Sequence, residues 1–330
     1  MESQQYISHI MRPQERLIEA AELKKLTAPK PWKFVWDYFF DFAVIAAAIA
    51  VNERFFFNPL VYLGVVIVIG SRFNALTILM HETSHFLAFR SNTLNYLFGE
   101  PVGWLVLASM EGYRMNHMAH HRKLNTLEDP DWTRKFPQKS FHYPKSKQGF
   151  WLDVLKQGSG IGFVRTLSDI MKSKTMTKSI PVKIKRLKLA FYLAIIAVCA
   201  ITGTLHGLVL YWIIPLMTVF NLALWLRSLA EHYNLEYDHP YNHARSMKVN
   251  PVEAFLLTPH RSNYHAEHHL YPGVPYHHLD KLHRILMENP AYAGHAHITK
   301  GIAGLARELS GDPVGPSFDQ MVAWQKEANS

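Results

Sequence analysis

Long apolar stretches predict helices that are able to cross a lipid bilayer. Between Leu189 and Leu226 the chain has no Asp, Glu, Lys or Arg. This stretch is too long for one crossing, which needs about 20 residues. The segment Gly-Thr-Leu-His-Gly at 203–207 interrupts it, as is typical of a turn. We therefore expect two spans, at 189–205 and 208–229, rather than a buried hairpin in a soluble core.

A second apolar region, nearer the N-terminus, predicts another pair of spans at 38–57 and 59–80. Polar residues interrupt it at Asn52-Glu53-Arg54 and at Asn58-Pro59, where we expect the turn. The first of these spans is the weaker, because it carries Asp41 near one end. The sequence thus predicts an all-α integral membrane protein with four transmembrane helices in two hairpins.

The spans divide the 330 residues into three parts. We expect a cytosolic N-terminal segment at 1–35, a membrane domain at 36–285 and a cytosolic C-terminal tail at 286–330. The helix of the second span has no proline or glycine between Gly70 and His85, so it is expected to continue beyond the bilayer.

Charge orients the chain in the membrane. Residues 111–188 hold 17 Lys or Arg and 6 Asp or Glu, a balance of +11 that exceeds the +9 of the whole chain. The turns between the paired spans hold almost no charge, so the positive-inside rule places 111–188 and both termini in the cytoplasm. A basic surface also suits anionic headgroups or an acidic electron-transfer protein. Nucleic acid is a poor partner for a protein with four spans.

Histidines form three clusters at helical spacing. The chain has 20 His and a single Cys, Cys199 inside the third expected span, which excludes a disulfide framework and a thiolate metal site. Residues i and i+4 lie on one face of a helix, whereas neighbours point about 100° apart. Each cluster can therefore present imidazoles to one metal ion or to two. The clusters are His81 and His85; His117, His120 and His121; and His265, His268 and His269.

A ninth histidine, His232, lies where the fourth expected span ends, on the same side of the membrane. Neutral imidazole suits Fe, Zn, Cu and Ni. Nine imidazoles exceed the needs of one tetrahedral zinc, so the pattern favours two ions with open positions. Two redox metals beside a bilayer indicate activation of O2 on an apolar substrate.

With these motifs together, the chain resembles the membrane fatty acid desaturase superfamily, which includes related hydroxylases. The resemblance covers about 35–285 and rests on the three histidine boxes, on Ala230-Glu231-His232, and on Tyr264 to Pro272. It implies a cytosolic helical cap that holds two non-haem Fe ions through the nine histidines. It also implies O2 as co-substrate and electrons from ferredoxin or a cytochrome b5-type donor.

The resemblance predicts desaturation of a fatty acyl chain of a lipid, in a membrane such as the bacterial cytoplasmic membrane. Hydroxylation or ketolation of a lipid, hydrocarbon or carotenoid is the alternative. The stearoyl type has an Asn one turn before the ligand that matches His232, and this chain has Ser228 there, which puts a ligand at that position in doubt.

Carboxylates are expected to accept the outer N–H of the ligand imidazoles and so to orient them. His277, His278 and His283 are not expected to be ligands. The candidate carboxylates are Glu82, Glu111, Asp129, Glu231 and Glu267.

Two other functions fit part of the pattern. His81-Glu-Thr-Ser-His85 also reads H-E-x-x-H, the motif of zinc proteases in which the Glu is the base. An intramembrane zinc protease leaves the regular spacing of the other histidines unexplained. A metal-binding membrane protein without enzymatic activity is the second alternative.

Overall fold

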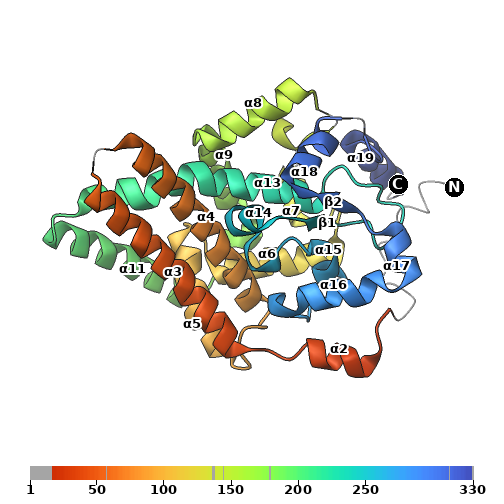
Figure 1. The fold of residues 1–330 in the computed structure, drawn as a ribbon, viewed down its shortest axis with the longest axis horizontal. Coiled ribbons are helices and arrows are strands. Elements are labelled where there is room, and N and C mark those ends of the chain that lie inside the picture. Colours follow the sequence, from red (N-terminus) through yellow and green to blue (C-terminus); the bar gives the residue numbers. More distant parts are fainter. Residues whose placement is uncertain are drawn as a thin grey trace. The chain divides into compact units, whose positions relative to one another are not determined.

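The computed structural model describes residues 17–56, 58–135, 138–143, 145–177, 180–311 and 313–328. The chain folds into two compact units. Figure 1 shows its helices and strands in chain order. The span unit comprises Lys30–Met115 and Leu155–Trp225, and the histidine unit comprises the described residues of Met1–Pro29, Asn116–Val154 and Leu226–Ser330. The structure is mostly helical, as the sequence predicts.

Helices make up all the regular structure that is described in the span unit. They are α3 (Pro31–Arg54), α4 (Pro59–Ser84), α5 (Asn92–Leu105), α9 (Ile161–Lys172), α10 (Lys174–Thr177), α11 (Val182–Ile201), α12 (Leu205–Gly207) and the π-helices η2 (Leu208–Ile213) and η3 (Leu216–Phe220). Helices α6 (Met110–Lys123), α8 (Lys147–Gly158) and α13 (Asn221–His232) contain residues of both units.

Three helical stretches in the described residues are long and apolar enough to cross a membrane: Ala20–Arg54, Pro59–Ser84 and Leu205–His232. They correspond to three of the four expected spans; the first ends at Arg54, three residues before the predicted end at 57, and the other two extend beyond their predicted bounds. Helix α11 covers most of the expected span 189–205, but it begins with basic residues at 183, 185, 186 and 188 and does not meet the same criterion. The expected turn is present, because α11 ends at Ile201 and Gly203 has a φ of 71°.

The first hairpin is closed by a capped turn. Asn58 accepts hydrogen bonds from the backbone N–H of Leu60 and of Val61, at 3.0 and 3.2 Å. Pro59 occupies the first helical position, where its missing N–H costs no hydrogen bond. From this turn α4 runs without a break to Ser84, so the helix carries His81 near its end.

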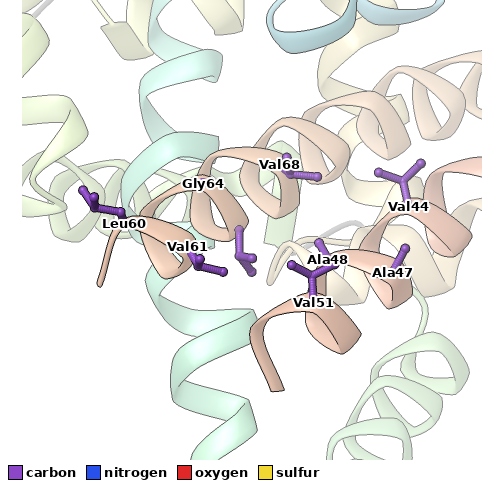
Figure 2. Close-up of a pocket in the computed structure, with 9 residues that line it drawn as sticks. Val44, Ala47, Ala48, Val51, Leu60, Val61, Gly64 and Val68 are labelled. Carbon is purple, nitrogen blue, oxygen red and sulfur yellow. The ribbon is translucent and has the colours of Figure 1, made fainter. Parts of the chain in front are cut away.

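Polar contacts join the helices of the span unit. Arg72 of α4 donates to the carboxylate of Asp41 of α3 at 2.9 Å, and both side chains are buried. Gly70 permits close packing of α4 on η3, because a Cβ there would lie 2.6 Å from the Cβ of Val219. An open, apolar groove of about 480 Å³ lies between α3 and α4; Val44 and Gly64 are among its lining residues (Figure 2).

The histidine unit consists of short helices and one small sheet. The helices are α2 (Ala20–Leu26), α7 (Pro130–Lys135), η1 (Lys139–Phe141), α14 (Pro251–Leu256), η4 (Pro259–Arg261), α15 (His265–Leu270), η5 (Tyr276–His278), α16 (Leu279–Met287), α17 (Pro290–His295), α18 (Gly301–Leu309) and α19 (Phe318–Ala328). The strands β1 (Ser246–Lys248) and β2 (Ile298–Lys300) pair in parallel, with Met247 opposite Thr299.

Candidate metal centre

The second histidine cluster lies on α6. His117 and His121 are one turn apart, and their Nε2 atoms are separated by 3.0 Å. The ring centroid of His120 lies 5.9 Å from that of His121, and its Nε2 atom approaches a different histidine, His232. Adjacent residues of one helix thus send their imidazoles to different neighbours.

His232 is the last residue of α13, and a buried arginine secures the end of that helix. Arg245 has no exposed side-chain surface and donates hydrogen bonds to the carbonyl oxygens of Leu229 at 3.2 Å and Ala230 at 2.9 Å. A helix end leaves its last carbonyls without intrahelical partners, so the guanidinium satisfies groups that would otherwise be buried without a hydrogen bond. The hydroxyl of Tyr237 donates to the carbonyl of His232 at 2.6 Å.

The third cluster lies on α15, whose six residues begin at His265. The Nε2 atoms of His265 and His269, one turn apart, are 3.0 Å from each other. The Nε2 atom of His268 instead lies 3.1 Å from that of His121.

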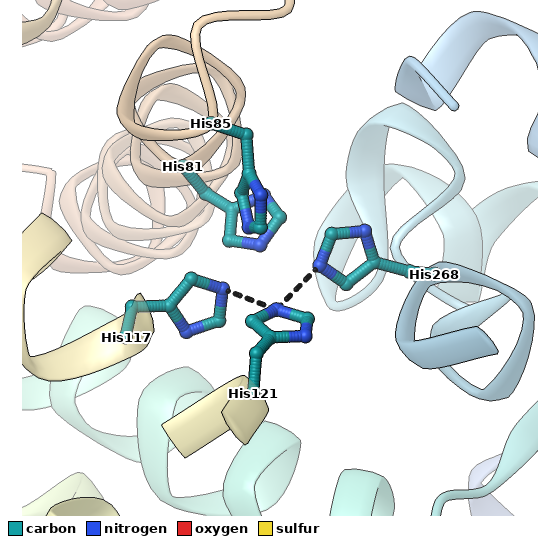
Figure 3. A group of neighbouring side chains, drawn as sticks. All are labelled: His81, His85, His117, His121 and His268. Carbon is teal, nitrogen blue, oxygen red and sulfur yellow. Dashed lines mark hydrogen bonds between the residues drawn. The ribbon is translucent and has the colours of Figure 1, made fainter. Parts of the chain in front are cut away.

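The seven imidazoles of the histidine unit therefore form two groups. In the first, Nε2 of His232 lies 2.9 Å from Nε2 of His265 and 3.2 Å from Nε2 of His120. Nε2 of His269 lies 3.0 Å from Nε2 of His265 and so belongs to the same group. In the second, His121 lies between His117 and His268 (Figure 3).

These distances match the edges of a metal coordination sphere. Bonds of about 2.1 Å from imidazole nitrogens to one metal, at an angle of 90°, place the two nitrogens about 3.0 Å apart. The ligand atoms of His120, His232 and His269 lie within 4.8 Å of one another, as do those of His117, His121 and His268. Each of these two sets of three histidines is therefore compact enough for one ion.

Acceptors on the outer ring nitrogens determine where the protons lie. Nδ1 of His120 is 2.8 Å from the carboxylate of Asp129, and Nδ1 of His232 is 3.3 Å from the carbonyl oxygen of His243. A carbonyl only accepts hydrogen bonds, so Nδ1 of His232 must carry the proton. In the neutral ring, Nε2 then presents a lone pair toward the other imidazoles.

Burial opposes protonation of two central rings, whereas in His120 the carboxylate of Asp129 outweighs burial and raises the pKa above its ordinary value. Burial lowers the pKa of His232 well below its ordinary value, with a further contribution from His120. Burial also lowers the pKa of His269, with contributions from His121 and His265. Converging Nε2 atoms of buried imidazoles are a donor set that a first-row transition metal satisfies once the rings are neutral, so these residues fit such an ion.

Asp129 connects this site to the following loop. Its carboxylate has no exposed surface and accepts hydrogen bonds from the backbone N–H of Asn125 at 3.1 Å and of Asp131 at 2.9 Å. The Asn125 side chain donates to the carbonyl of His243 at 2.9 Å, the same oxygen that faces His232.

Asp129 was expected from the sequence as an orienting carboxylate. The roles of Asn125, His243 and Arg245 were missed, because no spacing rule distinguishes them.

The other expected carboxylates have different surroundings. Glu231 lies 3.8 Å from Nδ1 of His265, beyond hydrogen-bonding distance, and pairs with Arg227. Glu111 accepts a hydrogen bond from Tyr96 at 2.6 Å. The fully buried Glu267 accepts hydrogen bonds from three groups other than box histidines, which belong to Ser246, His283 and Tyr292.

The first box lies at the end of α4 in the span unit. His81 belongs to the last turn and His85 is the C-cap residue, with their ring centroids 4.7 Å apart (Figure 3). Burial, with a smaller contribution from Arg114, lowers the pKa of His85 to about 3, so this ring is also neutral. The carboxylate of Glu82 lies 3.7 Å from Nδ1 of His81.

Residues 57–301 match the family described as fatty acid desaturase. The chain belongs to the fatty acid desaturase family. It is therefore an oxidoreductase, and its family is generally di-iron, dependent on O2 and associated with membranes and lipid substrates. The matched range includes the eight histidines of the three boxes and the ninth candidate ligand, His232.

Two similar proteins carry related names. Dihydrorhizobitoxine desaturase of Bradyrhizobium elkanii is 30% identical over 270 residues, which cover 77% of this chain and 75% of that protein. The omega-3 fatty acid desaturase of the endoplasmic reticulum of Vigna radiata var. radiata is 25% identical over 266 residues, 72% of this chain and 66% of that protein. Both names describe desaturation, so neither the hydroxylase nor the protease alternative is favoured.

Proposed function

We propose that this desaturase introduces a double bond into a fatty acyl chain with O2 and two electrons from an external carrier. The observation that supports this most strongly is the convergence of seven Nε2 atoms in two compact groups of the histidine unit. His81 and His85 complete the proposed ligand set for two iron ions. That set is His81, His85, His117, His120, His121, His232, His265, His268 and His269.

The reaction needs a redox metal centre and a supply of electrons. When bound, the irons activate O2 so that hydrogen is removed from an unactivated C–H bond. Two hydrogens leave adjacent carbons of the substrate, and O2 with two further electrons and two protons becomes two molecules of water. Ferredoxin or a cytochrome b5-type protein is the proposed electron donor.

The protein's own part is to hold the ligands in one protonation state. The carboxylate of Asp129 and the carbonyl of His243 keep protons on the outer nitrogens of His120 and His232. In the neutral rings the inner nitrogens are then free of protons and available to metal. Burial of His232 and His269 opposes protonation of these two rings.

We further propose four spans, with both termini and all histidine boxes in the cytoplasm. Helix α11 is the additional span, since no charged residue follows Lys188 until Arg227. The balance of +11 in residues 111–188 supports this orientation, as does the end of α4 at the first box. A lipid substrate reaches such a site from the bilayer with its head group at the surface.

Expression in a lipid-producing host tests the proposed reaction. Mass spectrometry of total lipids should show an acyl chain that has lost two hydrogens, and this product should disappear in His268→Ala. His206→Ala is the matched control, because His206 lies in the turn helix α12, is exposed and belongs to no box. A product that has gained one oxygen would instead support the hydroxylase alternative, and an unchanged lipid profile would contradict both.

A second substrate class follows from one comparison. The relative that is 30% identical is named for dihydrorhizobitoxine rather than for a fatty acid. The same cells should therefore also be extracted for metabolites other than lipids. A loss of two hydrogens that is confined to this fraction would keep the desaturation chemistry and exclude a fatty acyl substrate.

A further inference from the structure

Helix α9 of the span unit exposes an apolar strip beside a basic edge. Ile161, Val164 and Met171 are 73%, 66% and 67% exposed. At 100° per residue these three positions fall within an arc of about 80°. Arg165 and Lys172 follow within about the next 40° of the same exposed side. The exposed residues of α9 are thus all apolar or cationic, and Ser168 and Asp169 of the same side are half-buried.

Hydrogen bonds attach α9 to a membrane-spanning helix. Thr166 of α9 donates to the side-chain oxygen of Asn221 at 3.1 Å. The amide nitrogen of Asn221 donates to the side-chain and backbone oxygens of Gln157, at 2.9 and 3.1 Å. Asn221 is only 1% exposed, so its amide is bonded entirely within the protein.

This attachment places α9 near one surface of the bilayer. Asn221 lies 16 residues beyond Leu205, where the candidate span Leu205–His232 begins. Helix α13 runs from Asn221 to the end of that span at His232, so at 1.5 Å per residue Asn221 lies about 16 Å from that end, in the half of the bilayer nearest to it. Amphipathic surface helices bury their apolar face by about 5–10 Å at this depth. The exposed strip of α9 is therefore level with lipid rather than with bulk water.

The start of α11 marks the same surface. Lys183, Lys185 and Arg186 are exposed, and the apolar part of α11 begins only after Lys188. Because α11 ends at the turn that precedes Leu205, its first residues lie on the membrane side opposite to that turn. That side is also the one nearer to Asn221. Cationic side chains therefore recur at the level of α9.

We propose that α9 lies in the membrane interface, with Ile161, Val164 and Met171 among the acyl chains. Arg165 and Lys172 hold the phosphate of anionic phospholipids in the same leaflet. The charge of the basic edge selects this occupant over a neutral lipid, and the depth of Asn221 selects a bilayer over a soluble protein. This placement of α9 rests on the proposed transmembrane topology and not on the reaction or its metal.

The single cysteine allows a direct test of membrane contact. In a Cys199→Ser background, Val164→Cys and Met171→Cys carry a nitroxide spin label in proteoliposomes. Ile196→Cys on the apolar part of α11 is the lipid reference. Val252→Cys on α14 is the aqueous reference, matched to Val164 in residue type and exposure, at 65%. Electron paramagnetic resonance then measures collisions of each label with O2 and with a water-soluble nickel chelate.

Labels at 164 and 171 should collide preferentially with O2, as the label at 196 does. Nickel access equal to that at 252 would overturn the proposal, because the strip would then face water. Exclusion of both reagents would overturn it too, because the strip would then be covered by another protein surface or by a second copy.

Lipid retention tests the basic edge. Native mass spectrometry compares phosphatidylglycerol with phosphatidylcholine on the wild type, on Arg165→Gln/Lys172→Gln and on Lys248→Gln/Lys300→Gln. The control removes the same charge from exposed residues of the histidine unit. Each basic residue near a membrane surface strengthens anionic lipid binding about fivefold, so the α9 pair should retain phosphatidylglycerol about 25-fold more weakly. Equal losses in both pairs, or none in either, would refute a specific role for α9.

Discussion

The side chain of Asp129 should determine how firmly the centre holds its metal. Asp129→Asn keeps the size of the side chain and replaces one carboxylate oxygen with an N–H donor. Where that amide faces His120, two donors meet, and the imidazole proton must move from Nδ1 to Nε2. The lone pair that points toward the metal is then lost.

Two estimates agree on the size of this effect. A hydrogen bond to a charged group contributes about 1.5–3 kcal/mol, which corresponds to about 10–150-fold in an equilibrium constant. Loss of an orienting partner of a metal ligand typically costs about 10–100-fold in metal affinity. The contact of 2.8 Å between Asp129 and His120 is fully buried, so water does not replace it. We therefore expect Asp129→Asn to bind iron about 10–100-fold more weakly.

Dialysis against graded concentrations of an iron chelator tests this loss of affinity. Elemental analysis then measures the iron that the purified protein retains. Asp131→Asn is the matched control, because it removes the same charge two residues away. Its carboxylate pairs with Arg134 and Lys135 rather than with a histidine. The reasoning would be refuted if Asp129→Asn kept iron at the chelator concentrations that the wild type withstands, or if both variants lost it equally.

Two further predictions concern stability. Burial lowers the pKa of His297, but hydrogen bonds to Glu236 and Glu308 outweigh burial and raise the pKa above 6.5. The folded protein therefore binds this proton more tightly than the unfolded chain does. The advantage in melting temperature over His297→Gln should be full below about pH 6.5 and shrink as the pH rises above it; an advantage that grows with pH would contradict this. Gly70→Leu should lower the melting temperature strongly, because its Cβ would lie 2.6 Å from the Cβ of Val219 in η3. Gly64→Leu on the same helix has no atom within 4 Å of its Cβ and faces the groove, so equal destabilisation by both would refute the packing argument.

Local pattern was sufficient for the helical class, for three candidate spans and for the family. Hydropathy located three candidate spans because a bilayer requires about 20 apolar residues wherever a helix crosses it. Gly203 located one turn because few residues other than glycine adopt a positive φ, and Asn58-Pro59 located the other because Asn caps a helix and Pro favours its first position. Helical spacing identified eight histidines before any fold was known, since i and i+4 lie on one face.

The grouping of the histidines depended on the tertiary structure. Sequence shows that His120 and His121 point in different directions, but only the fold shows that His120 meets His232 and that His121 meets His268. These contacts join residues more than 100 positions apart, and no periodicity extends across such a distance.

The partners of the outer ring nitrogens were equally hidden. Glu231, Glu267 and Asp129 look alike as carboxylates near a box, yet only Asp129 lies within hydrogen-bonding distance of a box histidine. The oxygen that faces His232 belongs to a backbone carbonyl, a group that every residue possesses. Sequence specifies which side chains are able to ligate a metal, because that is a property of each residue and of its helix. The folded chain alone decides where their protons lie, because that depends on which acceptor lies closest in space.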